Sequence, residues 1–249
     1  MLAVEQRDKV LLLTLNRPDK RNALHPELIA ALLESLYEAS DDPAINIIVI
    51  TGAGPSFCAG LDLDFLLSQD DEGKIEYLEI VFALFQQIYT QPQPVIAAIN
   101  GPAMAGGFDL AAMCDFRLCA PSATFAQTEI LLGLTQIMYP LYKVIGLSRA
   151  KELAMTGETI NADEAYRIGL VNHVFPAEGL MAEAMKLAEK LASRPRLALF
   201  ETKRLSRELI DLDTQSAFRR MGKAIRERIR SDEHKQMLNA FTNRMKQRD

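Results

Sequence analysis

Short apolar runs alternate with helical periodicity over most of the chain, up to about residue 195. Three runs of five or six mainly apolar residues predict buried strands at 10–15, 45–50 and 95–99. Between them, apolar residues spaced by three and four predict two amphipathic helices. The first begins at Pro26, and in the second Ile75, Leu78, Phe82, Phe85 and Tyr89 share the apolar face. This alternation of strands and helices is typical of an α/β domain.

Strand signals disappear toward the C-terminus. Helical periodicity continues over residues 196–209 and 213–246, with Gly222 as the candidate weak point. A polar, all-helical region of this kind buries little apolar surface alone, so we expect it to pack on the core or on another subunit. We therefore predict an α/β core over residues 1–195 and a helical region over residues 196–249.

Composition and charge narrow the classes of function. The formal net charge of −5 argues against a general nucleic-acid-binding protein. Residues 219–230 form a local basic cluster, which is either a solvated helix face or a contact for a small anion or a neighbouring subunit. The start of the chain predicts a first strand and not a signal peptide, and no apolar run approaches membrane-spanning length.

The cysteine and histidine residues indicate neither a disulfide framework nor a metal site. The three cysteines have no paired spacing, which fits a reducing compartment, and we expect a cytoplasmic protein. The three histidines are scattered and match no ligand spacing. Cys58 has no base partner in sequence, so a small buried residue is the simpler interpretation.

The most unusual segment places Gly106 and Gly107 directly before an apolar helix, with Asp109 in its first turn. Glycine lets the backbone approach a ligand closely, and the first-turn amides of a helix lack internal partners. These features favour a site for developing negative charge. Acidic residues are common at helix N-termini, but a carboxylate that enters an apolar core needs a partner or a task.

Two further segments add candidate groups. A bend of small residues at 56–63 offers the free amide of Leu61, and Glu129 stands between an aromatic strand-like segment and an aliphatic run. Taken alone, the first is explained as a plain loop and the second as an exposed residue at a strand end.

Several separated motifs occur in register. They are Asn16-Arg17-Pro18, Asn22-Ala23-Leu24, Phe57 to Leu63, Asn100-Gly101, Ala105 to Leu110, Glu129 and Gly157 to Val171. Through these motifs the chain resembles the enoyl-CoA hydratase/isomerase (crotonase) superfamily, and the likeness covers nearly its whole length.

The resemblance implies a ClpP/crotonase-like spiral of ββα units with a helical C-terminal trimerisation region, assembled as a homotrimer or homohexamer. It implies an oxyanion hole formed by the amides of Leu61 and Gly106, in which one donor contributes roughly 3 kcal/mol. Asp109 and Glu129 fall on the acid pair of hydratases. The resemblance also implies an acyl-CoA substrate, with coenzyme A present only as part of the thioester, and no metal. Its CoA-contacting positions are Lys20, Ala23, Ala59 and Leu61, while Phe241 and Lys246 resemble tail residues that reach a neighbouring subunit's CoA.

The chain departs from the family pattern at two places. Hydratases usually have Glu at the position that matches Asp109. The order Asp then Glu resembles dienoyl-CoA isomerases, but the position of their third carboxylate is Ile137 here. The Pro-Gly-rich loop expected after Gly133 is absent, and residues 134–140 are mainly apolar. There, Met138 and Tyr139 either narrow the acyl pocket or pack in the core, and Gln136 is a candidate hydrogen-bond donor.

Three functions stay open on the sequence. The first is an enoyl-CoA hydratase in which Glu129 is the principal acid/base and Asp109 positions and helps to activate water. The second is an isomerase that moves a double bond, with Glu129 as a lone proton shuttle. The third is a non-catalytic CoA-thioester-binding protein, since a fold does not determine its chemistry.

Overall fold

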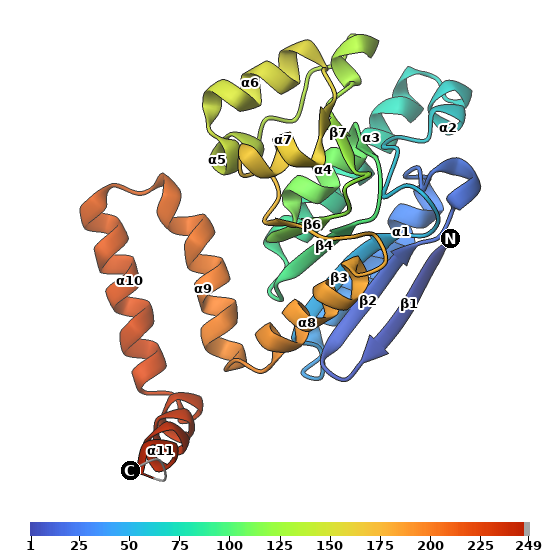
Figure 1. Ribbon diagram of the computed structural model, residues 1–249. Helices are drawn as coiled ribbons and strands as arrows, with labels where there is room; N and C mark the ends of the chain where they lie inside the picture. The colour runs from blue at the N-terminus through green and yellow to red at the C-terminus, as the bar shows by residue number, and fades with distance from the viewer. Residues whose placement is uncertain (247–249) are drawn as a thin grey trace. The chain divides into compact units, whose positions relative to one another are not determined.

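A mostly parallel sheet forms the centre of the first part of the chain in the computed structural model, which describes residues 1–246 (Figure 1). Only the β1–β2 pair is antiparallel in this sheet; each later pair is parallel. In spatial order its strands are β1 (Leu2–Arg7), β2 (Val10–Leu15), β3 (Ile47–Gly52), β4 (Val95–Ile99), β6 (Phe116–Cys119) and β9 (His173–Val174).

The three apolar runs lie in neighbouring strands of this sheet, β2, β3 and β4, which confirms their prediction. Nearly every residue of these strands is buried, as expected where both faces of a parallel sheet are covered. The N-terminal segment differs from the single strand that we expected. It forms a hairpin that turns at Asp8, and β1 is an exposed edge strand whose residues carry little hydrophobic pattern.

A smaller sheet contains β5 (Ala103–Met104), β7 (Thr124–Ala126) and β8 (Ile160–Asn161). Strand β5 pairs in parallel with β7, and isolated bridges join Cys58 to Ala103 and Leu24 to Leu61. The segment around Leu61 is thereby attached to the start of the glycine-rich motif, although more than forty residues separate them in sequence.

Helices cover the sheets of this first unit. They are η1 (Pro18–Lys20), α1 (Pro26–Asp41), α2 (Leu63–Ser68), α3 (Asp71–Thr90), α4 (Gly106–Met113), η2 (Glu129–Leu132), α5 (Leu141–Ile145), α6 (Leu147–Thr156), α7 (Ala162–Arg167) and α8 (Leu180–Ala192). Helix α1 buries Leu28, Leu32 and Leu36 in one apolar core with Leu13 of β2.

The predicted apolar face of α3 is partly wrong. The helix buries Val81, Leu84 and Ile88, whereas Ile75 and Phe82 are more than half exposed. Its sequence has apolar residues on more than one face, so spacing alone does not decide which face packs inward.

The chain divides into two units, Met1–Glu189 and Lys190–Asp249. Beyond α8, the second unit contains α9 (Arg196–Glu208), η3 (Leu209–Asp211), α10 (Thr214–Ile229) and α11 (Asp232–Lys246). Helix α10 runs through Gly222, so the predicted weak point is wrong. The break falls at Arg230 and Ser231, where the Ser231 hydroxyl accepts from the His234 N–H and caps the start of α11.

None of the described helices is long and apolar enough to cross a membrane.

Candidate active site

The turn that starts α4 leaves the Gly106 N–H without a partner in the described part of the chain. Ala105 precedes the helix at φ 50° and ψ −128°, and the N–H of Gly106, the first helical residue, makes no hydrogen bond within residues 1–246. Gly107 packs tightly against the loop that contains Cys58: a Cβ added to Gly107 would stand 2.1 Å from the Cys58 carbonyl oxygen. Only glycine lets the helix approach that loop so closely.

The Gly60–Leu61 loop lies against this turn. Backbone bonds hold it, from the Leu24 N–H to the Gly60 oxygen at 2.8 Å and from the Ala59 N–H to the Arg21 oxygen at 2.9 Å. Gly60 has φ +90°, and a Cβ on it would lie 2.8 Å from the Gly106 nitrogen. The Leu61 N–H also makes no hydrogen bond within the described residues. Leu61 and Gly106 line one cavity of about 260 Å³.

Asp109 and Glu129 line that cavity too, although they come from α4 and from the first residue of η2. Asp109 is 2% exposed; its Oδ1 accepts from the Gln127 amide nitrogen at 2.8 Å, while Oδ2 has no partner in the described structure. Glu129 is 9% exposed, and its Oε2 is likewise unpartnered among residues 1–246. Buried acceptors of this kind call for a donor such as water or a ligand.

The electrostatics favour a proton on this pair. Burial raises the pKa of Asp109 well above its usual value; the nearby Glu129 carboxylate adds to the rise, and the Gln127 amide opposes it. Burial also raises the pKa of Glu129, against the bonds from its own backbone N–H and from the Gln136 amide. Two carboxylates in one apolar cavity repel each other, so the doubly ionised pair is disfavoured.

The rest of the cavity is mainly apolar. Its wall is formed by Leu78, Val81, Phe82 and Phe85 of α3 and by Leu134, Thr135, Gln136 and Ile137 of the segment after η2.

Two residues proposed to narrow the acyl pocket lie elsewhere. Met138 lines a different hollow, and Tyr139 is 42% exposed and stacks edge-on against Tyr89. Gln136 does reach the cavity, but its amide nitrogen donates to the Gln127 carbonyl at 3.2 Å and its Oε1 is a buried acceptor without a partner among the described residues.

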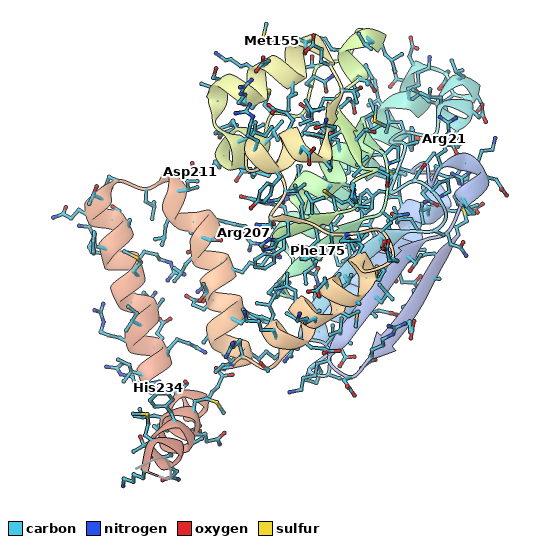
Figure 2. The ribbon with its side chains drawn as sticks, viewed as in Figure 1. Arg21, Met155, Phe175, Arg207, Asp211 and His234 are labelled. Carbon is cyan, nitrogen blue, oxygen red and sulfur yellow. The ribbon has the colours of Figure 1, made fainter. Side chains whose placement is uncertain are left out.

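A second cavity of about 350 Å³ shares Leu61 and Glu129 with the first. The other predicted CoA-contacting residues of this unit, Lys20, Ala23 and Ala59, all line it. Lys20 pairs there with Asp64 at 2.8 Å in an exposed ion pair. The neighbouring Arg21, labelled in Figure 2, lines the same cavity.

Two predicted CoA contacts lie in the second unit. Phe241 and Lys246 are on α11, and both are exposed. Their role toward a neighbouring subunit stays a prediction.

Gln127 is a site residue that sequence reasoning missed. It is fully buried, and its amide nitrogen bridges Asp109 and the Ile137 carbonyl at 2.8 and 2.9 Å. The one signal in the sequence is its spacing, because Gln127 stands midway between the buried Phe125 of β7 and Glu129, just beyond the end of that strand.

No group of His, Cys, Asp and Glu in the described structure is arranged to hold a metal ion. Asp62, which neighbours Leu61, has a structural role. Its carboxylate caps α2 by accepting from the Phe65 N–H at 3.2 Å, and it pairs with Arg17 at 2.8 Å.

The chemistry available here combines two kinds of group. Unpartnered N–H groups stabilise negative charge that develops on a carbonyl oxygen, and a carboxyl pair that shares a proton both donates and accepts it. The two cavities meet at Leu61 and Glu129, so a long substrate can place its reacting group between them.

Comparisons with known proteins identify the family of the chain. The family model described as enoyl-CoA hydratase/isomerase matches residues 5–248. The chain is 34% identical to crotonyl-CoA hydratase of Syntrophomonas wolfei, over 98% of this chain and 96% of that protein. It is 35% identical to 2,3-dehydroadipyl-CoA hydratase of Escherichia coli, over 86% and 85%.

A solved structure confirms the predicted fold. The enoyl-CoA hydratase of Bacillus anthracis superposes with a TM-score of 0.95 at 32% identity, over 98% of this chain and 96% of that one. Members of the matched family act on coenzyme A thioesters, typically without a further cofactor. The chain belongs to the enoyl-CoA hydratase/isomerase (crotonase) family, with its α/β fold and C-terminal helices.

Proposed function

We propose that the protein is an enoyl-CoA hydratase, which adds water across the 2,3-double bond of an acyl-CoA thioester. One observation carries the proposal: Asp109 Oδ2 and Glu129 Oε2, which have no partner among the described residues, belong to one cavity with Leu61 and Gly106, whose N–H groups have none there either. The curated relatives reported above, both named as hydratases, support the same chemistry.

In the proposed mechanism the thioester oxygen lies between the N–H groups of Leu61 and Gly106. A water molecule donates to the two free carboxyl oxygens, and the ionised member of the pair takes its proton. The water oxygen bonds to C3, and the electrons of the double bond move onto the thioester oxygen as an enolate. Glu129 then delivers a proton to C2, and the pair regains its single shared proton.

The two N–H groups act on charge that is larger in the transition state than in the substrate. Each contributes about 3 kcal/mol in that role, which corresponds to a factor of 10² to 10³ in kcat. Asp109 is shorter by one methylene than the glutamate expected there, so the proposed water lies closer to α4.

The rival isomerase differs in its proton carriers. A single-base isomerase uses Glu129 alone, whereas hydration uses both acids. The position of the third carboxylate of dienoyl-CoA isomerases is held here by Ile137, whose side chain lines the cavity. This absence of an acid favours hydration over a dienoyl shift.

The test compares two substrates. Purified protein is incubated with crotonyl-CoA, and the loss of the conjugated-enone absorbance is followed. A 3-enoyl-CoA is then incubated with the protein, and a gain of the same absorbance is looked for. Loss with the first supports hydration. Gain with the second alone replaces the proposal by an isomerase, and tight binding without either signal replaces it by a binding protein.

Substitutions at the acids test their roles. We expect Glu129→Gln to abolish turnover while CoA-thioester binding is kept, and Asp109→Asn to reduce hydration much more than any isomerisation. Glu34→Gln, on the exposed face of α1, is the matched control and keeps wild-type turnover. Near-normal turnover of Glu129→Gln contradicts the assignment of the proton carrier.

We also infer that residues 196–249 pack on the core and on neighbouring subunits in a homotrimer or homohexamer, in which Phe241 and Lys246 contact a neighbour's CoA. Large apolar side chains are exposed on α10 and α11, among them Phe218, Ile225 and Leu238, each more than half exposed. Light scattering on the purified protein tests the assembly, and a monomer contradicts it. We propose a cytoplasmic location, which fits three cysteines that are buried as thiols.

A further inference from the structure

Ala105 has a backbone conformation that L-residues rarely adopt, directly before the Gly106 N–H. Its φ is 50° and its ψ is −128°. Arg21, another residue with positive φ, has ψ 35° and lies in the ordinary left-handed region, whereas Ala105 lies outside it. Glycine adopts such a conformation without clash, but a Cβ makes it costly.

Hydrogen bonds on both sides hold Ala105 in this conformation. Its N–H donates to the Ala126 carbonyl at 2.8 Å, which ties it to the end of β7. Its carbonyl accepts from the N–H groups of Phe108 at 2.8 Å and Asp109 at 3.1 Å, which ties it to the first turn of α4. The strand and the helix therefore impose the orientation of both peptide groups around Ala105, and with it the direction of the Gly106 N–H.

The methyl group of Ala105 touches the other loop of the site. A Cβ added to Gly60 would lie 2.8 Å from the Ala105 Cβ, so this methyl packs directly over the Gly60 backbone. Gly60 precedes Leu61, whose N–H is the second free donor. The methyl thus stands between the two loops that carry the donors.

We propose that Ala105 is a positioning residue, whose methyl group sets the separation of the Leu61 and Gly106 N–H groups at the expense of backbone strain. The inference rests on the proposed function, since it assigns those groups to one thioester oxygen. It predicts opposite signs for stability and turnover, which a merely structural residue does not produce.

The decisive variant is Ala105→Gly. It removes the strain and the spacer together, so the urea midpoint of unfolding rises while kcat for crotonyl-CoA falls about 10-fold, with KM changed less than threefold. The loss is smaller than the 10²- to 10³-fold that follows removal of a donor, because both donors remain and only their placement loosens.

Two further variants complete the comparison. Asp8→Gly relieves a positive φ of 50° in the β1–β2 turn, far from the site in sequence, and raises the urea midpoint with kcat unchanged. Ala105→Ser restores a Cβ, so its urea midpoint returns toward the wild-type value and it turns over several times faster than Ala105→Gly. Wild-type kcat in Ala105→Gly overturns the proposal, and so does a lowered urea midpoint.

A second readout separates this inference from the hydratase assignment. Acetoacetyl-CoA is an enolisable thioester, and a pair of N–H donors on its carbonyl oxygen raises the near-ultraviolet absorbance of the enolate. We expect Ala105→Gly to bind this probe with a weaker enolate signal. If the wild type gives the signal but hydrates no enoyl-CoA, the hydratase assignment fails and the positioning role is still decided by the variant. An equal signal in both proteins overturns the positioning role alone.

Discussion

Replacing Gly107 by alanine tests how closely α4 must approach the Cys58 loop. The new Cβ would lie 2.1 Å from the Cys58 carbonyl oxygen, more than 1 Å short of the 3.4 Å at which ordinary contact begins, and 2.7 Å from its carbonyl carbon. Both atoms belong to backbone, so no side-chain rotation relieves the clash, and α4 has to move.

The expected cost follows from two opposing effects. Overpacking of this kind costs about 1–3 kcal/mol, and alanine in a helix regains up to about 1 kcal/mol over glycine. Because the clash is with main-chain atoms, we expect a net loss of about 2 kcal/mol in the free energy of unfolding. A shift of α4 by about 1 Å also moves the Gly106 N–H and Asp109, and such misplacement lowers kcat by about 10²-fold.

Urea denaturation and crotonyl-CoA hydration measure the two effects. Gly106→Ala is the matched control for stability, since its Cβ would meet Leu24, Gly60 and Phe85 at 3.5–3.6 Å, which is ordinary contact. We expect the urea midpoint of unfolding of this control to equal or exceed that of the wild type. If Gly107→Ala unfolds together with the control, the close approach of α4 does not limit this position.

Three further predictions concern buried polar groups. The 2.8 Å hydrogen bond from Gln127 lowers the pKa of Asp109. Gln127→Leu removes this bond, so the Asp109 pKa rises and the pH–rate profile should move to higher pH. A profile that does not move contradicts a role of Gln127 in the site. Because the Asp109 pKa is raised, the folded wild type binds the carboxyl proton more tightly than the unfolded chain does, and it loses stability as the pH rises. Asp109→Asn should therefore be more stable than the wild type above pH 4, by a margin that grows toward neutral pH. A margin in urea denaturation that is the same at pH 4 and 7 contradicts this. Arg117→Met should lower the free energy of unfolding, measured by urea denaturation, by about 3 kcal/mol or more, because the buried carbonyls of Leu170 and Cys114 lose their guanidinium donor. Arg117→Lys, which lacks the planar fork of donors, should not restore that stability.

The sequence by itself determined the central strands and the main helices, and it indicated Asp109 and Glu129 as candidate acids. Strands β2, β3 and β4 are continuous apolar runs because both faces of a parallel sheet are buried, and that demand is visible residue by residue. Asp109 stood out because a carboxylate in an apolar helix start needs a partner. The glycines before the helix and the bend at 56–63 pointed to Gly106 and Leu61, and the family motifs added that their N–H groups act together on one oxygen.

Only the tertiary structure decided how those pieces meet. Which face of α3 packs inward depends on the neighbouring elements, so spacing placed Phe82 in the core although it lines the cavity and is half exposed. The contact between Gly60 and Ala105, and the bond from Gln127 to Asp109, join segments that are distant in sequence. A local pattern records what one segment buries, whereas a site made of main-chain donors and shared protons depends on distances between segments, which no single stretch of sequence contains.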